Sequence, residues 1–585
     1  MRYPFILFML LSFFACKNTQ KTGEYEVIDN ITYYSGKKTN NLVYQISNDP
    51  ETIALWQGQT GSRKDIKSFI HGWLYYNEED GSMTPGIAKD SLKVSADGLT
   101  YSVEIHPDAK WEDGTPITAQ DALFSIKVAV CPLSDNAATG NYVEFLKAFI
   151  IDEANPKKFQ VEMKSYYMMN YVLLSNFPII DKRGYDPQHV LDKYSLEQLR
   201  QPAAQLAKDA ALQAWVKAYT DVKYGRDPQF AKGAGMYELA TWTAGQEIVL
   251  KRKAHFWAKN LHGEYFDQYP DTMTFKVVKE PTAIEMGFKQ EQLDVAFNPT
   301  ATVYKKLLKD PQTLSNYVLR EGSRFTYTMA VFNLHPNKKK SNAAIEDVQV
   351  RKAIAYLCPV QDIIDQIVEG FGDPVATPVY FKSPQCNQKL KPIAYNAAKA
   401  DSMLSAAGWK DTDNDKILDK VINGKKTKLS FSLTYNAKGG NSDLIVRRVQ
   451  TELQKAGIDA TLDPIEQNGL MDKLNTKNFD VVFMALSPGS ILVDFKESWG
   501  RSGGANYSGF GTAETDKLIE QIRTTQAPKQ FKILSDSMQQ ILYDQQPVVF
   551  FYNSRGRMIV HRRFNHVEKL NFFDTPLNVL EMRRK

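Results

Sequence analysis

The sequence predicts an α/β protein of several domains, because chain length, composition and local patterns agree on that class. The chain has 585 residues, which corresponds to three or four domains at roughly 150 residues each. Hydrophobic residues make up 43% of the chain, enough to build buried cores. Helical and strand patterns interleave throughout, which favours layered α/β or α+β architecture over a bundle or a sandwich.

Four segments carry the clearest secondary-structure signals. YSVEIH (101–106) and FDVVFMAL (479–486) are predicted strands. DVQVRKAIAYL (347–357) and LIVRRVQTELQKAG (444–457) place apolar residues at helical spacing, and Gly457 is expected to end the second helix. The chain contains no internal repeat.

The stretch AKWEDGTPITAQDALFSI (109–126) gathers acids around a tryptophan, and the pattern assigns them local roles. Asp113 precedes a glycine, so we expect it to accept backbone N–H bonds in a turn. Thr118 stands three residues before Asp121 and just ahead of an apolar run, the spacing of a helix N-cap. Trp111 is expected in the core. These local roles leave no pair of catalytic carboxylates here.

Charge and the N-terminal segment bear on partners. A net charge of +5 over this length gives no strong electrostatic field, so we expect no nucleic-acid partner and no charged contact with lipid.

The segment MRYPFILFMLLSFFAC has a basic residue, a ten-residue apolar run and a small residue before Cys16. Residues 1–15 are therefore a predicted signal peptide, too short to span a bilayer. SFFAC resembles the lipobox of bacterial lipoproteins, which implies lipidation of Cys16 and a tether over 16–23.

Neither cysteine spacing nor an acidic loop predicts a metal site. Cys131, Cys358 and Cys386 lack metal-ligand spacing, so buried thiols are favoured, with one disulfide possible. DTDNDKILD (411–419) resembles a calcium loop, but Lys416 replaces the glycine that the sharp turn requires. A solvated loop is favoured there, and calcium binding stays open.

The chain also lacks the usual catalytic motifs. It has no G-x-S-x-G, no H-E-x-x-H and no phosphate-binding glycine loop, and its eight histidines are scattered singly. We therefore predict no catalytic residues, no cofactor and no enzymatic activity, with a hydrolase the least favoured class.

Six blocks in order along the chain resemble the family 5 extracellular solute-binding proteins, the dipeptide- and oligopeptide-type components of ABC importers. The first is TPGIAKDSLKVSADGLTYSVEIHPDAKWEDGTPITAQDALFSI, and the second is GAGMYELATWTAGQEIVLKRKAHFW. The other four include YNAAKADSMLSAAGW and ANYSGFGTAETDKLIEQI. The blocks cover most of the chain between Asn41 and Phe551.

The resemblance implies a two-lobed periplasmic-binding-protein fold (class II, cluster C type) that closes by a hinge rotation. An extra subdomain is inserted in the first lobe. Strands crossing between the lobes are expected near 324–330 and 546–551. The implied segments are 24–79, 206–324 and 546–585 for lobe I, 80–205 for the inserted subdomain, and 325–545 for lobe II.

The resemblance also places the ligand loop after the strand FDVVFMAL. In peptide-binding members an Asp in this loop pairs with the peptide α-amino group, and Gly489 takes that position here. Leu486 or Ser487 replaces the aromatic residue that often precedes the Asp. A buried ammonium without a counter-charge is costly, so another partner would be required. Asp494 either supplies that charge or caps the helix leading to Trp499. The remaining predicted ligand-binding residues are Asn48, Thr328, Met329, Phe332, Asn506 and Tyr507.

The expected function is that of a monomeric, membrane-anchored binding lipoprotein in the periplasm or cell envelope. It would capture a peptide-like solute and deliver it to ABC permease and ATPase subunits. A non-peptide solute (metal chelate, haem or oligosaccharide) remains open because the Asp is missing. A sensory or chaperone role also remains open, since fold does not fix function.

Overall fold

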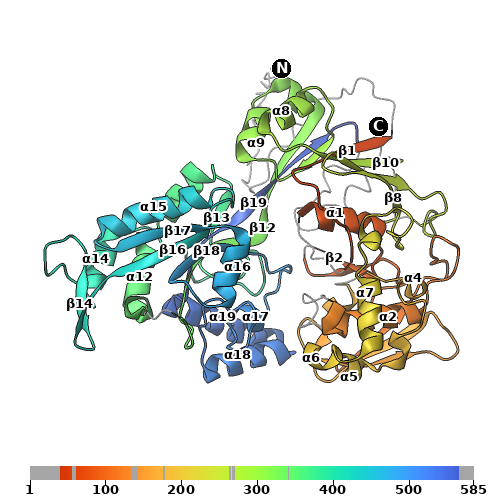
Figure 1. Cartoon of the computed structure of the whole chain (residues 1–585), viewed down its shortest axis with the longest axis horizontal. Coiled ribbons are helices and arrows are strands. Elements are labelled where there is room, and N and C mark those ends of the chain that lie inside the picture. The colour runs from red at the N-terminus through yellow and green to blue at the C-terminus, as the bar shows by residue number, and fades with distance from the viewer. Residues whose placement is uncertain are drawn as a thin grey trace, which may run out of the picture.

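One mixed sheet of 11 strands connects the two lobes of the molecule (Figure 1). The computed structural model describes residues 40–55, 61–78, 80–134, 143–175, 178–261, 265–266, 270–339 and 342–564. Within these residues the strand order is β17-β16-β18-β12-β19-β11-β1-β10-β9-β8, and β13 pairs with β19. The predicted signal peptide, the tether and Cys16 lie outside the described residues.

The first lobe is built on the β8, β9, β10, β1 and β11 end of this sheet. Parallel pairing of β1 with β10 and β11 brings segments more than 200 residues apart into one layer, and α1 packs against it. The strands are β1 Asn41–Ile46, β8 Tyr237–Thr243, β9 Glu247–Arg252, β10 Thr272–Val277 and β11 Val295–Phe297. The helices are α1 Gly61–Ile70, α8 Pro281–Lys289, α9 Ala301–Leu308 and α10 Pro311–Asn316.

A separate unit with its own four-stranded sheet lies beside the first lobe, at lower right in Figure 1. Its strand order is β4-β5-β7-β6, and a small hairpin, β2 Tyr75–Asn77 and β3 Met83–Pro85, precedes it. The strands are β4 Lys93–Val94, β5 Thr100–Glu104, β6 Leu146–Ile151 and β7 Lys158–Met163. The helices are α2 Ala119–Val130, η1 Pro132–Ser134, η3 Asn170–Leu174, α4 Lys182–Tyr185, η4 Leu191–Lys193, α5 Leu196–Leu199, α6 Ala203–Leu206, α7 Ala210–Tyr219 and η5 Val222–Gly225.

The acidic stretch 109–126 runs from the loop after β5 into α2 of this unit and forms the predicted turn and helix cap. Trp111 is 6% exposed in the core under α2. The N–H of Thr115 donates to Asp113 Oδ1 at 3.0 Å in the turn. The N–H of Thr118 donates to Asp121 Oδ2 at 2.9 Å, which closes the predicted cap. Burial of Asp121 raises the pKa of its carboxyl, and the hydrogen bonds from Thr118 oppose that rise.

The second lobe carries the β16, β17 and β18 end of the large sheet between two layers of helices, at left in Figure 1. Its strands are β12 Tyr317–Phe332, β13 Gly372–Pro374, β14 Asp419–Ile422, β15 Lys425–Lys428, β16 Ser430–Asn436, β17 Asp459–Ile465, β18 Val481–Leu486 and β19 Val548–His561. Its helices are α11 Ala343–Glu346, α12 Val348–Leu357, α13 Val360–Asp362, η6 Ile363–Ile367, α14 Ala397–Ala406, α15 Ser442–Lys455, α16 Gln467–Asn475, α17 Phe495–Trp499, α18 Ala513–Thr524 and α19 Pro528–Gln545.

The four segments with clear local signals adopt the predicted structures. They become β5, β18, α12 and α15. Gly457 has φ +77° just after α15, a conformation that side chains with a Cβ rarely adopt, and this glycine ends the helix as expected. Cys131, Cys358 and Cys386 are buried free thiols.

The antiparallel strands β12 and β19 run from one lobe into the other (Figure 1). Their register breaks where residues 324–326 of β12 stand opposite Ser554 alone, a bulge held by Asn553 Nδ2, which donates to the carbonyls of Phe325 and Thr326. Residues 548–550 of β19 pair with 331–329 of β12, so the two expected crossing segments, 324–330 and 546–551, lie partly opposite each other. The bulge falls inside 324–330, where the hinge is expected.

Candidate ligand-binding site between the lobes

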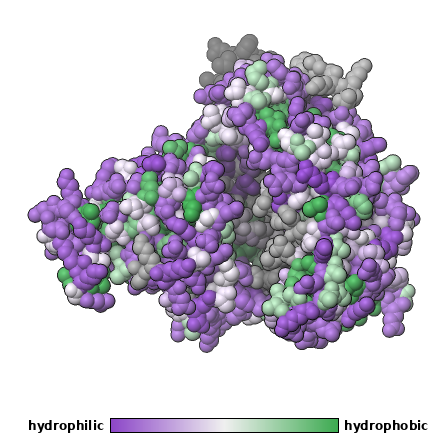
Figure 2. Space-filling view, viewed as in Figure 1, coloured by the Kyte–Doolittle hydropathy of each residue, from purple (hydrophilic) through white to green (hydrophobic). Residues whose placement is uncertain are grey.

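The surface is hollowed between the two lobes, and the rim of this hollow is mostly hydrophilic (Figure 2). The loop 487–494 follows β18 on the second-lobe side. At its tip Ser487 and Gly489 are exposed. Gly489 has φ +68°, and no atom lies within 4 Å of where its Cβ would be. The tip is therefore accessible, and it carries no charge.

The far end of the loop is fixed by a buried glutamine that the sequence did not indicate. The N–H of Val493 donates to Gln385 Oε1 at 2.7 Å, and Gln385 Nε2 donates to the Val493 carbonyl at 3.0 Å. Gln385 is 0% exposed. Sequence separation hides this pair, because 108 residues lie between the partners.

Asp494 is a helix cap and a partner of internal groups, so of its two predicted roles the structure shows the cap. Its Oδ1 accepts the N–H of Lys496 at 2.9 Å, which caps α17. Its Oδ2 accepts the Tyr167 hydroxyl at 2.7 Å and Arg523 Nε at 3.0 Å. The Asp494 side chain is only 9% exposed.

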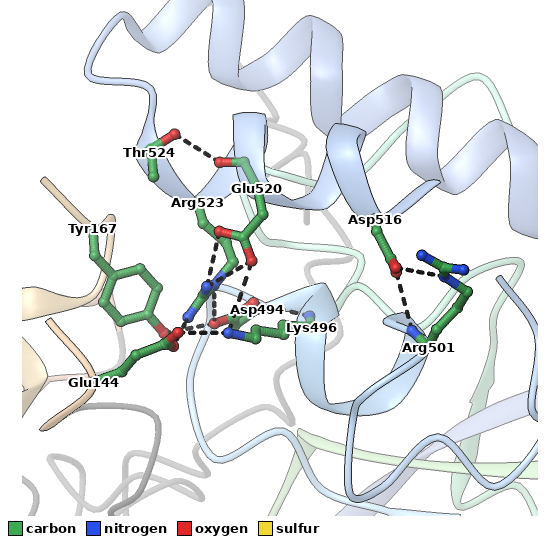
Figure 3. A network of polar contacts seen from close by, with 9 residues as sticks. All are labelled: Glu144, Tyr167, Asp494, Lys496, Arg501, Asp516, Glu520, Arg523 and Thr524. Carbon is green, nitrogen blue, oxygen red and sulfur yellow. Dashed lines mark hydrogen bonds and ion pairs between the residues drawn. The ribbon is translucent and has the colours of Figure 1, made fainter. Parts of the chain in front are cut away.

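Arg523, a buried arginine paired with three acids, lies beside the loop (Figure 3). Its guanidinium pairs with Asp494, Glu520 and Glu144, and the Arg523 side chain is 0% exposed. Burial lowers the pKa of Arg523, but the three acids more than offset this effect, so its pKa lies above the ordinary value. Burial raises the pKa of Glu144, and bonds from Lys496 and Arg523 reverse that, leaving its pKa below the usual range.

Two predicted ligand-binding residues lie in the core instead. Met329 and Phe332 on β12 are 2% and 0% exposed and pack inside the second lobe, because helices cover both faces of the sheet there. We therefore withdraw them as ligand contacts. Thr328, between Tyr327 and Met329, is half-buried and pairs in register with Ala485 of β18.

The other predicted ligand-binding residues, Asn506, Tyr507 and Asn48, differ in how far they are buried. Asn506 is buried and shapes its own loop, because its Nδ2 donates to the carbonyls of Gly500 and Phe510. Tyr507 is half-buried against the core near α18, and burial raises its pKa. Asn48 follows β1 on the first lobe and is exposed.

Comparison with known proteins identifies the class. Residues 82–506 match the model for bacterial extracellular solute-binding proteins, family 5. The chain belongs to this family, which confirms the resemblance. It is similar to the oligopeptide-binding protein AppA of Bacillus subtilis, with 27% identity over 84% of this chain and 82% of AppA.

Solved structures share the fold. The structure of AppA from Bacillus subtilis in complex with a nonapeptide has a TM-score of 0.71 at 23% identity, covering 93% of this chain and 99% of that one. NikZ from Campylobacter jejuni in complex with Ni(L-His) has a TM-score of 0.70 at 19% identity, covering 94% and 100%. The two-lobed fold class is thereby confirmed. Among the described residues, no helix is both long enough and apolar enough to cross a membrane.

Proposed function

We propose that this chain is the substrate-binding component of an ABC importer and captures a peptide-like solute between its lobes. The observation that carries the proposal is the similarity to AppA over 84% of the chain. The paired strands β12 and β19 and the accessible loop after β18 support it. The solute would be handed to permease and ATPase subunits, with this chain acting as a monomer and not as an enzyme.

The uncharged loop tip limits how a peptide would be held. With Gly489 at the tip and Asp494 paired internally, no loop acid is left for a terminal ammonium. Main-chain hydrogen bonds would then supply most of the recognition. Native mass spectrometry of the purified chain tests this proposal. A ladder of peptide masses is the expected result, and one discrete non-peptide mass would contradict it.

A non-peptide solute is the second candidate, and the same uncharged tip favours it. The likeness of the fold to NikZ in complex with Ni(L-His) is compatible with this candidate. Metal analysis of the sample used for mass spectrometry would separate a chelate from haem or an oligosaccharide. A sensory or chaperone role ranks lower, and a hydrolase last.

We further propose that the mature chain is a lipoprotein anchored through Cys16 in the periplasm or cell envelope, with residues 1–15 removed and 16–23 as a tether. The lipobox-like SFFAC supports this. Incorporation of labelled palmitate that disappears in Cys16→Ser is expected, and its absence in the unmodified chain would refute anchoring. The proposed division is lobe I at 24–79, 206–324 and 546–585, the inserted subdomain at 80–205, and lobe II at 325–545.

A further inference from the structure

Arg523 lies where the two halves of the molecule meet, away from the hinge. It belongs to α18 of the second lobe, whereas Glu144 and Tyr167 belong to the unit with the four-stranded sheet (Figure 3). Arg523 Nη2 donates to Glu144 Oε2 at 2.8 Å, and Lys496 Nζ lies 2.6 Å from Glu144 Oε1. One glutamate thus receives two cations from the opposite lobe.

Aromatic rings and backbone groups complete the contact around this guanidinium. The Arg523 guanidinium carbon lies 4.9 Å from the centre of the Phe145 ring and 4.8 Å from that of Tyr167. The N–H of Met168 donates to the Arg523 carbonyl at 2.8 Å. A second bond runs from Gln526 Nε2 to the carbonyl of Asp97 at 2.9 Å. Side chains and backbone of one lobe therefore bind the other directly.

The apolar part of the contact is small and adjoins these charges. Tyr167, Met168 and Met169 are 1%, 7% and 2% exposed, and they share a cluster with Trp499 and Ile522 of the second lobe. Separation of the lobes about the hinge would expose these side chains together with Arg523. The contact therefore belongs to the arrangement that the structure describes, and it would be lost if the lobes moved apart.

The composition of the contact suits an interaction that is made and broken repeatedly. Opening an apolar interface costs free energy in proportion to the apolar area that becomes exposed to water. Opening an ion pair costs less, because the two charged groups regain their hydration. A desolvated ion pair is consequently close to neutral in net free energy but strict in geometry. Such a contact fixes one closed arrangement without making it permanent.

We propose that Arg523 is an interlobe latch, holding the cleft shut by binding Glu144 across the lobe boundary while Asp494 and Glu520 position its guanidinium from its own lobe. Control of ligand release by this latch rests on the proposed binding function. The latch itself is a property of the protein alone, because all its members are residues of this chain.

Hydrogen–deuterium exchange of the full chain without added ligand tests the latch, with the Met168 amide as reporter. That N–H is protected by a bond across the lobe boundary, so its exchange rate follows the open fraction. Glu144→Gln keeps the size of a side chain that is 39% exposed, and Glu144→Lys adds repulsion toward Arg523 and Lys496. Arg501→Gln is the matched control, because Arg501 is 56% exposed and pairs with Asp516 within the second lobe.

Exchange at Met168 should rise about fivefold in Glu144→Gln, the upper range for a partly exposed ion pair, and further in Glu144→Lys. It should be unchanged in Arg501→Gln, and amides of β16 should be unchanged in all variants. Unchanged exchange at Met168 in both Glu144 variants would overturn the latch, as would equal acceleration in β16. Because no ligand is added, failure of peptide binding and failure of the latch are separate outcomes.

Discussion

Arg523 Nε donates to Asp494 Oδ2 at 3.0 Å, and this pairing takes the only acid of the ligand loop out of the cleft. A carboxylate that already neutralises a buried guanidinium and caps α17 has little remaining capacity for a ligand ammonium. The loop therefore lacks an acid at Gly489, and its one acid, Asp494, is already paired inside the protein. Both point to a site that does not select its ligand by a free α-amine.

Asp494→Ala should destabilise the protein instead of weakening one class of ligand. It removes the cap of α17 and a charge partner of a fully buried arginine, so we expect a loss of about 3 kcal/mol in the free energy of unfolding. Asp494→Asn, which can still cap the helix, should lose less. Urea unfolding measures both, with Glu466→Ala as the exposed control. Full stability with a tenfold loss of affinity for amine-bearing peptides would restore the anchor role.

Gly489→Asp should create the missing amine anchor. The tip is exposed and has room for a side chain, although φ +68° costs a non-glycine residue about 1 kcal/mol. We expect affinity for peptides with a free N-terminus to rise about tenfold over their N-acetylated forms. Calorimetry with matched peptide pairs measures the ratio, which should be near one in the unmodified protein. Gly489→Asn carries the same strain without the charge, so an equal gain there would contradict the explanation.

Local sequence signals predicted those parts of the fold whose causes are local. Thr118 and Asp121 are three residues apart, and the helix they cap is formed by its own apolar spacing. Gly457 ends α15 because its positive φ suits glycine. The pairing of β19 could not be predicted, since nothing in residues 546–551 indicates which part of a 14-residue strand lies opposite residues 329–331 of β12.

The site was less predictable because its contacts join distant parts of the chain. Tyr167 and Asp494 are 327 residues apart, and Glu144 and Arg523 are 379 apart. On α18, Arg523 resembles any helix-surface arginine paired with Glu520 three residues earlier. Its complete burial depends on a neighbouring unit that no local pattern could place against it.

Gln385→Ala should loosen the ligand loop. It leaves the N–H and the carbonyl of Val493 without their buried partner, at a cost of about 1–3 kcal/mol for each group. Thermal unfolding should show lower stability, and hydrogen exchange should accelerate over 487–493. Gln388→Ala is the control, because Gln388 is exposed and its side chain donates to the Phe381 carbonyl, a bond far less buried than the Gln385 pair. Equal effects of the two substitutions would show that the buried pair has no special role.

Calcium should not stabilise the acidic loop 411–419. The acid oxygens of Asp411, Asp413 and Asp419 lie within 4.8 Å of one another, but Lys426 Nζ is 2.8 Å from Asp413 and 3.2 Å from Asp419. An ammonium already supplies the positive charge there. The melting temperature should be the same in calcium and in chelator. In Lys426→Met, which removes that cation, calcium should raise the melting temperature. A calcium-dependent rise in the melting temperature of the unmodified protein would contradict this prediction.

The contact between the lobes should weaken in acid because of Glu144. Its pKa in the closed arrangement lies below the usual 4.5, since bonds from Lys496 and Arg523 outweigh burial. Because this pKa is lowered, Glu144 stabilises the contact fully above pH 4.5. That stabilisation is lost as the pH falls through the lower pKa of the closed arrangement. The other groups that face the same guanidinium are Asp494, Glu520 and Tyr167, and Glu144→Gln leaves all three in place.

Exchange at the Met168 amide, corrected for the intrinsic pH dependence of exchange, should therefore be flat from about pH 7 to 5 and should rise below about pH 4. In Glu144→Gln the rise should be smaller, because the substituted amide does not titrate. The two proteins should converge at the lowest pH, where Glu144 is protonated in both the open and the closed arrangement. Identical pH profiles in the two proteins would mean that Glu144 does not carry the acid sensitivity of the contact.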